Sequence, residues 1–167
     1  MIQIYTGDGK GKTTAALGLA IRAAGAGLRV YIGQFMKGRP YSELKMLKKI
    51  PNIRFQQFGT ACFIKRKVRK RDVELANRGL KQIEKIVARR LYDLIILDEI
   101  NVALHFGLVG LNQIIRLLKS APKDVELVLT GCRANPRILK LADLVSEIKD
   151  VKHYYKKGIK ARRGIEF

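Results

Sequence analysis

The chain has 167 residues, of which 47% are hydrophobic, and its basic residues exceed its acidic residues by enough to give a net charge of +20. A chain of this length buries one hydrophobic core and is too short for two ordinary domains, so we expect a single domain over residues 1–167. No apolar run approaches the roughly 18 residues that a membrane-spanning helix needs. A strand-like segment begins at Ile2, where an export signal would lie. We therefore expect a cytoplasmic protein.

The excess of positive charge attracts nucleotides, acidic proteins and nucleic acid, and does not choose among them. Its densest runs are residues 65–71 and 156–163. Because no nucleic-acid-binding motif accompanies these runs, we favour a solvated surface that suits a polyphosphate substrate over a nucleic-acid partner. The two cysteines, Cys62 and Cys132, lack the spacing of a zinc site or a disulfide framework, so we expect ordinary thiols.

Short apolar segments alternate with helical patterns, which predicts an α/β fold with a mostly parallel sheet of about six strands and helices on both faces. The expected strands are residues 2–5, 29–34, 53–58, 94–97, 126–129 and 144–148. The helix at residues 12–24 is apolar almost all round, which is typical of a helix packed between the sheet and an outer layer. The helix at residues 72–90 repeats apolar residues every three or four positions, with Asp72 as its expected N-cap.

Three glycines at alternate positions, Gly7, Gly9 and Gly11, follow the first strand and open the first helix. Such a turn lets backbone N–H groups surround a phosphate without obstruction from side chains. Lys12 then supplies a fixed positive charge and Thr13 offers a hydroxyl to a magnesium ion, as in the phosphate-binding loop, or P-loop. The residues expected to bind the nucleotide are Gly7, Asp8, Gly9, Lys10, Gly11, Lys12, Thr13 and Thr14.

The expected fourth strand, residues 94–97, is followed by two carboxylates, Asp98 and Glu99. Either can hold a magnesium ion opposite Thr13, directly or through water. Together the two motifs predict a P-loop domain of the RecA-like kind that binds ATP with Mg²⁺. Kinases, GTPases, motor ATPases and recombinases share the P-loop, so the motif predicts how the phosphates are bound and does not predict which reaction follows.

Further motifs run colinearly through the chain. They are residues 5–16, 34–38, 97–101, 103–104, 107–108, 129–131, 141–145, 151–153 and 164–167. On these motifs the chain resembles the corrinoid adenosyltransferases of the cobalamin-synthesis type, which act on cob(I)yrinic acid a,c-diamide or cob(I)alamin. The resemblance implies that the Co(I) of a reduced corrinoid attacks the 5′ carbon of ATP and expels triphosphate, in adenosylcobalamin synthesis or salvage. It also implies a homodimer, a flavoprotein reductant and a nucleotide bound in the reverse of the usual P-loop orientation.

This resemblance gives the expected site residues their roles. Lys12, Lys10 and Thr13 would act in catalysis by neutralising the charge that grows on the departing triphosphate. Thr13 would also hold Mg²⁺, together with Glu99 or Asp98. The attacking cobalt arrives with the corrinoid substrate, so the protein needs no nucleophile of its own.

The chain departs from the family pattern on the corrinoid side. The stretch 59–71, which lacks periodicity and is expected to be a loop with substrate contacts, has no tryptophan where some relatives have one. Its one aromatic residue, Phe63, is the candidate for a corrinoid contact. Cys132 stands where relatives usually carry an arginine, whose role could pass to Arg133. Some relatives also cover the corrinoid with an N-terminal extension, whereas we expect the first strand here at Ile2.

Two other functions are compatible with a P-loop. In a nucleic-acid-dependent ATPase, Glu99 would orient a water molecule toward the γ-phosphate and the run 65–71 would bind the nucleic-acid backbone. In a small-molecule kinase, Arg66, Arg69 and Arg71 would close over the γ-phosphate as a lid. Both alternatives predict cleavage between the β- and γ-phosphates, whereas adenosyl transfer releases intact triphosphate.

Overall fold

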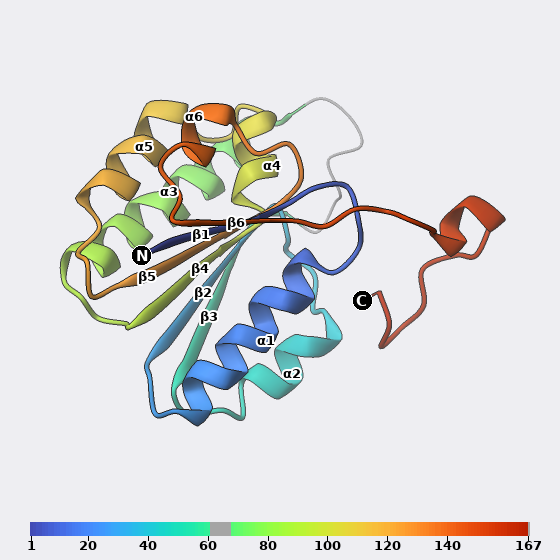
Figure 1. The fold of residues 1–167 in the computed structure, drawn as a ribbon, viewed down its shortest axis with the longest axis horizontal. Helices are drawn as coiled ribbons and strands as arrows, with labels where there is room; N and C mark the ends of the chain where they lie inside the picture. Colours follow the sequence, from blue (N-terminus) through green and yellow to red (C-terminus); the bar gives the residue numbers. More distant parts are fainter. Residues whose placement is uncertain (61–67, 167) are drawn as a thin grey trace.

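The structure, a computed structural model, describes residues 1–60 and 68–166. Six strands form one parallel sheet in the order β3-β2-β4-β5-β1-β6 (Figure 1). The strands are β1 (Ile2–Thr6), β2 (Val30–Phe35), β3 (Ile53–Phe58), β4 (Leu94–Asp98), β5 (Glu126–Thr130) and β6 (Leu144–Glu147). Each bound lies within one residue of the expected one, and the predicted α/β fold is confirmed.

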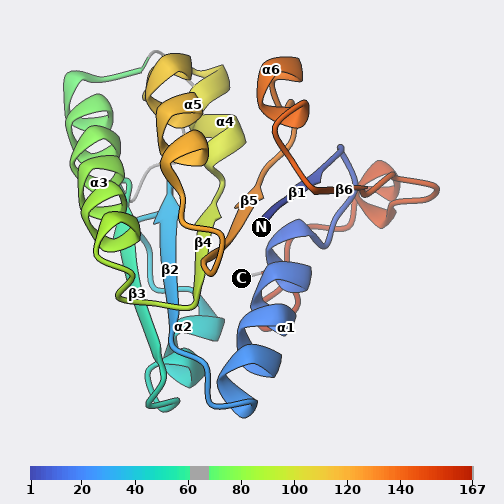
Figure 2. The same ribbon diagram turned by 60° about the vertical axis from the view of Figure 1, so that its left-hand side comes forward.

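Helices cover both faces of the sheet, as expected. They are α1 (Lys12–Gly25), α2 (Ser42–Leu47), α3 (Lys70–Ala88), α4 (Ile100–His105), α5 (Leu111–Ser120), α6 (Pro136–Leu139) and the 3₁₀ helix η1 (Tyr154–Lys157). Figure 1 and Figure 2 show α1 and α2 on one face of the sheet, with α3, α4, α5 and α6 on the other. In the described ranges, no helix combines the length and the apolar character needed to cross a bilayer.

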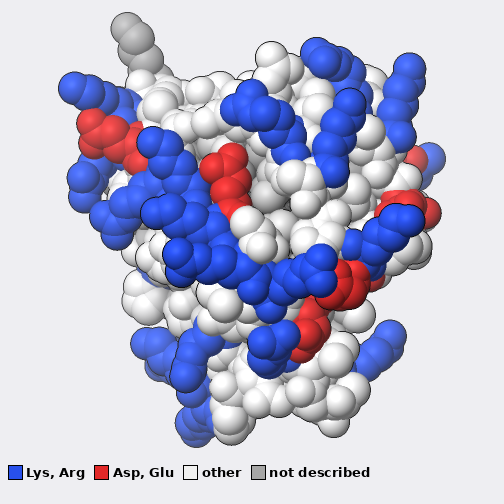
Figure 3. Space-filling model, turned by 90° about the vertical axis from the view of Figure 1, so that its left-hand side faces the viewer, with Lys and Arg blue, Asp and Glu red and all other residues white. Residues whose placement is uncertain are grey.

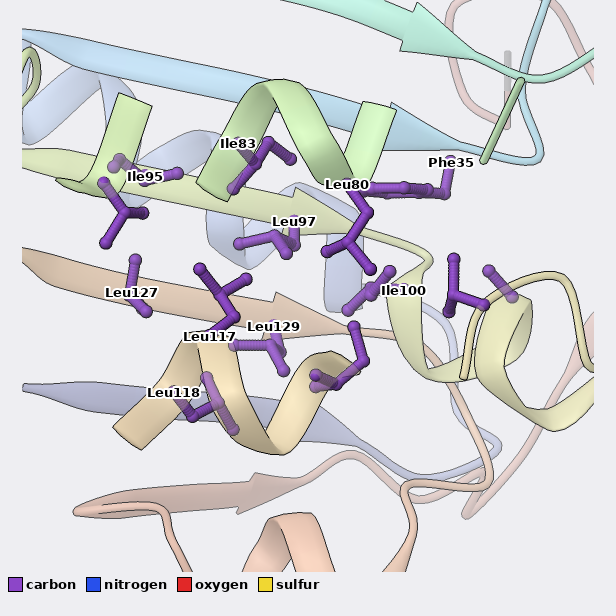
Figure 4. Packing of buried hydrophobic residues seen from close by; sticks show 14 of the residues in the cluster. Phe35, Leu80, Ile83, Ile95, Leu97, Ile100, Leu117, Leu118, Leu127 and Leu129 are labelled. Carbon is purple, nitrogen blue, oxygen red and sulfur yellow. The ribbon is translucent and has the colours of Figure 1, made fainter. Parts of the chain in front are cut away.

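The sheet separates two layers of buried side chains, because successive residues of a strand point to opposite faces. On β4, Ile95 and Leu97 pack in the layer that includes Leu80 of α3 and Leu117 of α5 (Figure 4). The alternate residues of the same strand pack in the layer that includes the alanines of α1. A strand buried on both faces has a continuous apolar sequence, which explains why the sequence identifies β4 clearly.

Helix α1 differs from the prediction that it packs between the sheet and an outer layer. It buries only one stripe, formed by Ala16, Ala20 and Ala23, whereas Ile21 is 55% exposed. The apolar residues of its outer face are therefore open at the surface. Ile21 and Leu17 on this face line the cleft described below.

Helix α3 begins at Lys70, and the expectation that Asp72 is its N-cap is wrong. The N-cap is Arg69, whose backbone N–H donates to the Asp72 carboxylate at 3.1 Å. The other oxygen of this carboxylate accepts from the Thr60 hydroxyl at 2.9 Å. Asp72 therefore joins residues on either side of the segment 61–67, which lies outside the described residues.

Candidate active site

The carboxyl ends of β1, β5, β4 and β2 lie side by side at one edge of the sheet. Parallel pairing places Tyr5 beside Thr130, and Gln34 beside Asp98. The turn after β1 and the acidic end of β4 therefore open toward the same edge. This is where ligands bind in open parallel sheets.

The turn between β1 and α1 presents backbone N–H groups at this edge. Gly11, at φ 123°, is the N-cap of α1, and no side chain caps the first turn, so its N–H groups are available to an anion. Gly7 packs against the chain after β6, where a Cβ would lie 2.3 Å from the backbone oxygen of Ile148. The N–H of Gly9 donates to the same oxygen at 2.8 Å. Gly7 and Gly9 are thus needed for packing within the protein as well as for access to phosphate.

The Lys12 side chain folds over this turn. Its Nζ donates to the backbone oxygens of Gly7 and Gly9, each at 2.7 Å. These contacts hold a positive charge next to the N-terminus of α1, which carries a partial positive charge of its own. The loop therefore offers two adjacent sources of positive potential to an anion.

Asp98, at the end of β4, is buried and accepts four hydrogen bonds. Its Oδ1 accepts from Thr13 Oγ1 at 2.9 Å and from Thr130 Oγ1 at 2.7 Å. Its Oδ2 accepts from Lys37 Nζ at 2.8 Å and from Gln34 Nε2 at 3.3 Å. Because these donors use the acceptor capacity of both oxygens, Asp98 is placed to orient the Thr13 hydroxyl and to act on a metal ion indirectly.

Of Asp98 and Glu99, the two carboxylates at the end of β4, Glu99 is the one that lines the cleft. It adopts the left-handed conformation, at φ 61°, between β4 and α4. Burial, and next the neighbouring Asp98 carboxylate, raise the pKa of Glu99 because both disfavour its charged form. Within the described residues its carboxylate has no hydrogen-bond or ion-pair partner. A cation at this position would relieve both effects.

The donors available to a metal ion are few. Over residues 1–60 and 68–166, no group of three or more His, Cys, Asp or Glu side chains is arranged to hold one. At the P-loop side of the cleft the Thr13 hydroxyl and the Glu99 carboxylate are available as donors, and Asp98 lies behind Thr13. Such a set suits Mg²⁺, which typically binds through one or two carboxylates and completes its coordination with substrate phosphates and water.

Lys37, in the turn after β2, is the only charged donor among the four described groups that donate hydrogen bonds to Asp98. Its side chain is 14% exposed, and its Nζ lies 3.3 Å from Thr13 Oγ1. Burial alone would lower the pKa of Lys37, but the Asp98 carboxylate, with smaller contributions from Glu99 and Glu43, offsets this effect and the pKa is raised. Lys37 is therefore a partly buried ammonium at neutral pH. Its motif, residues 34–38, marks it in the sequence without indicating this role.

The C-terminal segment lies against the P-loop. Lys10 Nζ donates to Tyr154 Oη at 2.7 Å and to Glu166 Oε1 at 2.8 Å, and the Tyr154 hydroxyl donates to the same Glu166 oxygen. The Lys10 ammonium, the Tyr154 hydroxyl and the backbone N–H of Arg162 hold the pKa of Glu166 well below its usual range. Tyr154 and Glu166, in the C-terminal segment, thus form a wall beside the P-loop, which lies near the start of the chain.

Together these elements enclose a cleft of about 750 Å³. Its lining from the P-loop is Asp8, Gly9, Lys10, Gly11, Lys12, Thr13 and Thr14. Glu99 also lines it, whereas Gly7 and Asp98, two further expected site residues, lie behind the lining. Side chains without an expected role line it too, among them Leu17, Ile21, Lys37, Tyr41, His153, Ile165 and Glu166. The motifs 34–38, 151–153 and 164–167 are the sequence signal for four of these.

Arg133 and His105 contact each other outside this lining. The Arg133 guanidinium lies 2.7 Å from His105 Nε2, and Arg133 does not border the cleft. The Cys132 thiol is free and half-buried. Phe63, the expected corrinoid contact, and Cys62 lie outside the described residues.

A strand, a glycine-rich loop, a helix and an acidic strand end at one edge of a parallel sheet define a P-loop-like α/β fold. The structure is similar to that of a KaiC-like protein from Pyrococcus horikoshii, with a TM-score of 0.56 over 87% of this chain and 71% of the other. The two sequences are 17% identical, so this likeness shows a shared fold and nothing about the reaction.

Sequence comparison identifies the family. The model of the family described as ATP:corrinoid adenosyltransferase BtuR/CobO/CobP matches residues 1–167. Corrinoid adenosyltransferases of Salmonella typhimurium, Escherichia coli and Pseudomonas aeruginosa are 34%, 33% and 32% identical to this chain. The matches cover 100% of this chain and 85%, 85% and 83% of those proteins. The chain belongs to the ATP:corrinoid adenosyltransferase family, which confirms the resemblance, the transferase class and the expected function.

Proposed function

We propose that residues 1–167 form a single nucleotide-binding domain that transfers the 5′-deoxyadenosyl group of ATP to the Co(I) of a reduced corrinoid and releases triphosphate at the cleft described above. The observation that carries this proposal is the convergence of Lys12, Thr13 and Glu99 on one cleft of about 750 Å³. A cleft of this size accommodates a nucleotide. The lysines and the open N-terminus of α1 suit its triphosphate.

The reaction requires electrostatic stabilisation more than acid–base chemistry. The electron pair of Co(I) forms the cobalt–carbon bond, the bond between C5′ and the triphosphate oxygen breaks with its own electron pair, and no proton is transferred. Negative charge therefore accumulates on the triphosphate in the transition state. Lys12, Lys10 and the N–H groups of the first turn of α1 stabilise this charge. The other loop residues, from Gly7 to Thr14, hold the triphosphate in position.

We propose that Thr13 and Glu99 hold Mg²⁺ together with the phosphates, while Asp98 acts through Thr13. This assignment is supported by the 2.9 Å hydrogen bond that orients the Thr13 hydroxyl and by the Glu99 carboxylate, which has no partner among the described residues. When bound, Mg²⁺ supplies further charge neutralisation at the phosphate oxygens. The chain's part is to place one hydroxyl and one carboxylate at the phosphate end of the cleft.

We propose that the protein is a homodimer that uses the apolar surface near its C-terminus. β6 is an edge strand, and Leu144, Val145, Val151 and Tyr155 are exposed in or after it, Val151 to 97%. Edge strands and exposed apolar residues are features that proteins commonly cover by association. Light scattering on the purified protein measures its mass in solution, and a monomer would contradict this assignment.

The basic surface favours an acidic flavoprotein as the reductant of the corrinoid. Figure 3 shows a face of the molecule on which Lys and Arg side chains far outnumber Asp and Glu. On α3, Arg78, Lys81 and Lys85 border a shallow hollow. Such a surface speeds encounter with an acidic protein and predicts that electron delivery slows as salt increases. We propose a cytoplasmic location, where ATP and flavoproteins are available, and we do not propose a nucleic-acid or membrane partner.

One assay distinguishes adenosyl transfer from the ATPase and kinase reactions. The protein is incubated with ATP, Mg²⁺ and chemically reduced cobalamin, and the phosphate product is identified. Free triphosphate together with a cobalt–carbon product supports the proposal. Formation of ADP, with or without added nucleic acid, would overturn it.

The P-loop assignment is tested with Lys12→Ala. We expect this change to lower kcat by roughly 10²–10³, because it removes a charge from the leaving triphosphate. Turnover of reduced cobalamin is measured by its change in absorbance. Lys45→Ala is the matched control, since Lys45 is exposed on α2 and does not line the cleft. Unchanged turnover of the Lys12 variant would show that the P-loop is not the triphosphate site.

A further inference from the structure

Among the residues that the structure describes, three lysines line the cleft, and two of them belong to the P-loop. Lys10 and Lys12 enter from the turn after β1, whereas Lys37 enters from the turn after β2. The roles assigned above to the P-loop do not account for Lys37. A partly buried ammonium in an active-site cleft is a candidate for a function in the reaction.

The turn that carries Lys37 is held in one conformation. Met36, directly before it, is in the left-handed region at φ 58°, which is unfavourable for a residue with a side chain and is found mainly where the surroundings impose it. Gly38, directly after Lys37, packs so closely on the end of β3 that a Cβ on this residue would lie 2.5 Å from the backbone oxygen of Gly59. Phe35, at the end of β2, is buried in the core. The backbone therefore aims Lys37 at the cleft from a rigid support.

The Lys37 ammonium lies at the level of the phosphate loop. Its Nζ is 2.8 Å from Asp98 Oδ2 and 3.3 Å from Thr13 Oγ1. Thr13 is the second residue of α1 and directly follows Lys12. An ammonium within hydrogen-bond distance of Thr13 is within reach of any phosphate bound at the N-terminus of α1.

Asp98 does not need Lys37 to keep its place. Three neutral donors, Thr13, Thr130 and Gln34, already bind its two oxygens. Lys37 itself carries three N–H donors, and residues 1–60 and 68–166 accept two of them. The third donor has no oxygen or nitrogen acceptor in these ranges, and the Tyr41 ring, which lines the same cleft, lies 5.5 Å from Nζ in a cation–π contact. A ligand in the cleft can therefore accept from this donor.

We propose that Lys37 is a further catalytic residue, whose ammonium contacts the triphosphate from the β2 side of the cleft and stabilises the charge that collects on it when the C5′–O bond breaks. This inference rests on the proposed triphosphate site. Lys12 and Lys37 then neutralise the leaving group from two strands of the sheet. Asp98 holds Lys37 in position before the nucleotide binds.

The test measures binding of inorganic tripolyphosphate by calorimetry in excess EDTA, so that the protein supplies the cations. A charged hydrogen bond of this kind predicts about ten- to a hundredfold weaker binding by Lys37→Gln than by wild type. In the full reaction with ATP, Mg²⁺ and reduced cobalamin, the same variant should lose kcat by about tenfold or more. Lys45→Gln, which removes an equal charge from the exposed surface of α2, should bind as wild type does.

Two further variants separate the outcomes. If Lys12→Ala weakens tripolyphosphate binding and Lys37→Gln leaves it within about twofold of wild type, the role of Lys37 is refuted and the P-loop site stands. If neither variant weakens binding, the triphosphate site itself is wrong. Lys37→Arg keeps the charge and should retain part of the affinity.

A measurement on the wild-type protein covers the case in which Lys37→Gln does not fold. The ¹⁵N resonance of the Lys37 ammonium, identified by its loss in Lys37→Arg, should shift when tripolyphosphate saturates the protein. A resonance that does not move at saturation would overturn the proposed contact.

Discussion

Two lysine–carboxylate pairs border the cleft, and in each the Nζ lies 2.8 Å from a carboxylate oxygen. The inner pair, Lys37 with Asp98, has side chains that are 14% and 1% exposed. The outer pair, Lys10 with Glu166, has side chains that are 40% and 17% exposed. Water screens the outer pair, whereas protein groups replace the water around the inner one.

Equal distances therefore do not mean equal roles. The inner pair shares Asp98 with donors from α1, β5 and β2, so it is part of the framework that shapes the site. The outer pair joins the P-loop to the C-terminal segment through side chains that are more exposed than those of the inner pair. We infer that the inner pair builds the site and that the outer pair closes it reversibly.

The largest effect is expected from breaking the inner pair. Asp98→Ala leaves the Lys37 ammonium partly buried without its counter-ion, and we expect the free energy of unfolding to fall by about 3–5 kcal/mol. Urea denaturation measures this change. Asp124→Ala is the control, since it breaks a 3.4 Å pair with Arg90 in which the Arg90 and Asp124 side chains are 64% and 62% exposed, and it should cost about 1 kcal/mol or less. Equal losses in the two variants would remove the distinction between buried and exposed pairs.

Glu99 sharpens the comparison because it is a cleft carboxylate with no partner among the described residues. Its pKa is raised in the folded protein by burial and by Asp98, so the fold loses stability as the pH rises above 4.5 and through the raised pKa. We expect Glu99→Gln to melt a few degrees higher than wild type at neutral pH. The difference should vanish at a pH well below 4.5, where both the folded and the unfolded state of wild type carry the proton on Glu99. A lower melting temperature at neutral pH would contradict this assignment, and reduced Mg²⁺ binding should accompany the gain in stability.

The smallest effect is expected at the outer pair. Glu166→Gln should leave urea stability unchanged, because its contacts are at the surface and screened. His153 and Ile165, which belong to the same segment, line the cleft, so loosening this wall should speed nucleotide release by about two- to fivefold. Stopped-flow displacement of a fluorescent ATP analogue measures that rate. An unchanged rate at low salt would show that the outer pair does not close the cleft.

The elements that the sequence predicts well are those encoded by short-range patterns. Strand β4 is a continuous apolar run because it is buried on both faces, and the P-loop combines closely spaced glycines with Lys12 and Thr13. The start of α3 was misplaced because Asp72 caps from inside the helix, where its carboxylate meets the Arg69 N–H and Thr60. That second contact comes from Thr60, twelve positions before Asp72, and cannot be read from helical periodicity.

The sequence by itself determined the parallel α/β architecture, the phosphate loop and the acidic end of β4, since each depends on neighbours along the chain. Only the tertiary structure decided which groups surround that loop. Lys37 meets Asp98 across 61 positions, and Lys10 meets Glu166 across 156. The order of strands in the sheet brings Lys37 to Asp98, and the path of the C-terminal segment brings Glu166 to Lys10. These two features of the tertiary structure therefore decide that the Lys37 ammonium is largely desolvated and that the Lys10 ammonium remains in contact with water.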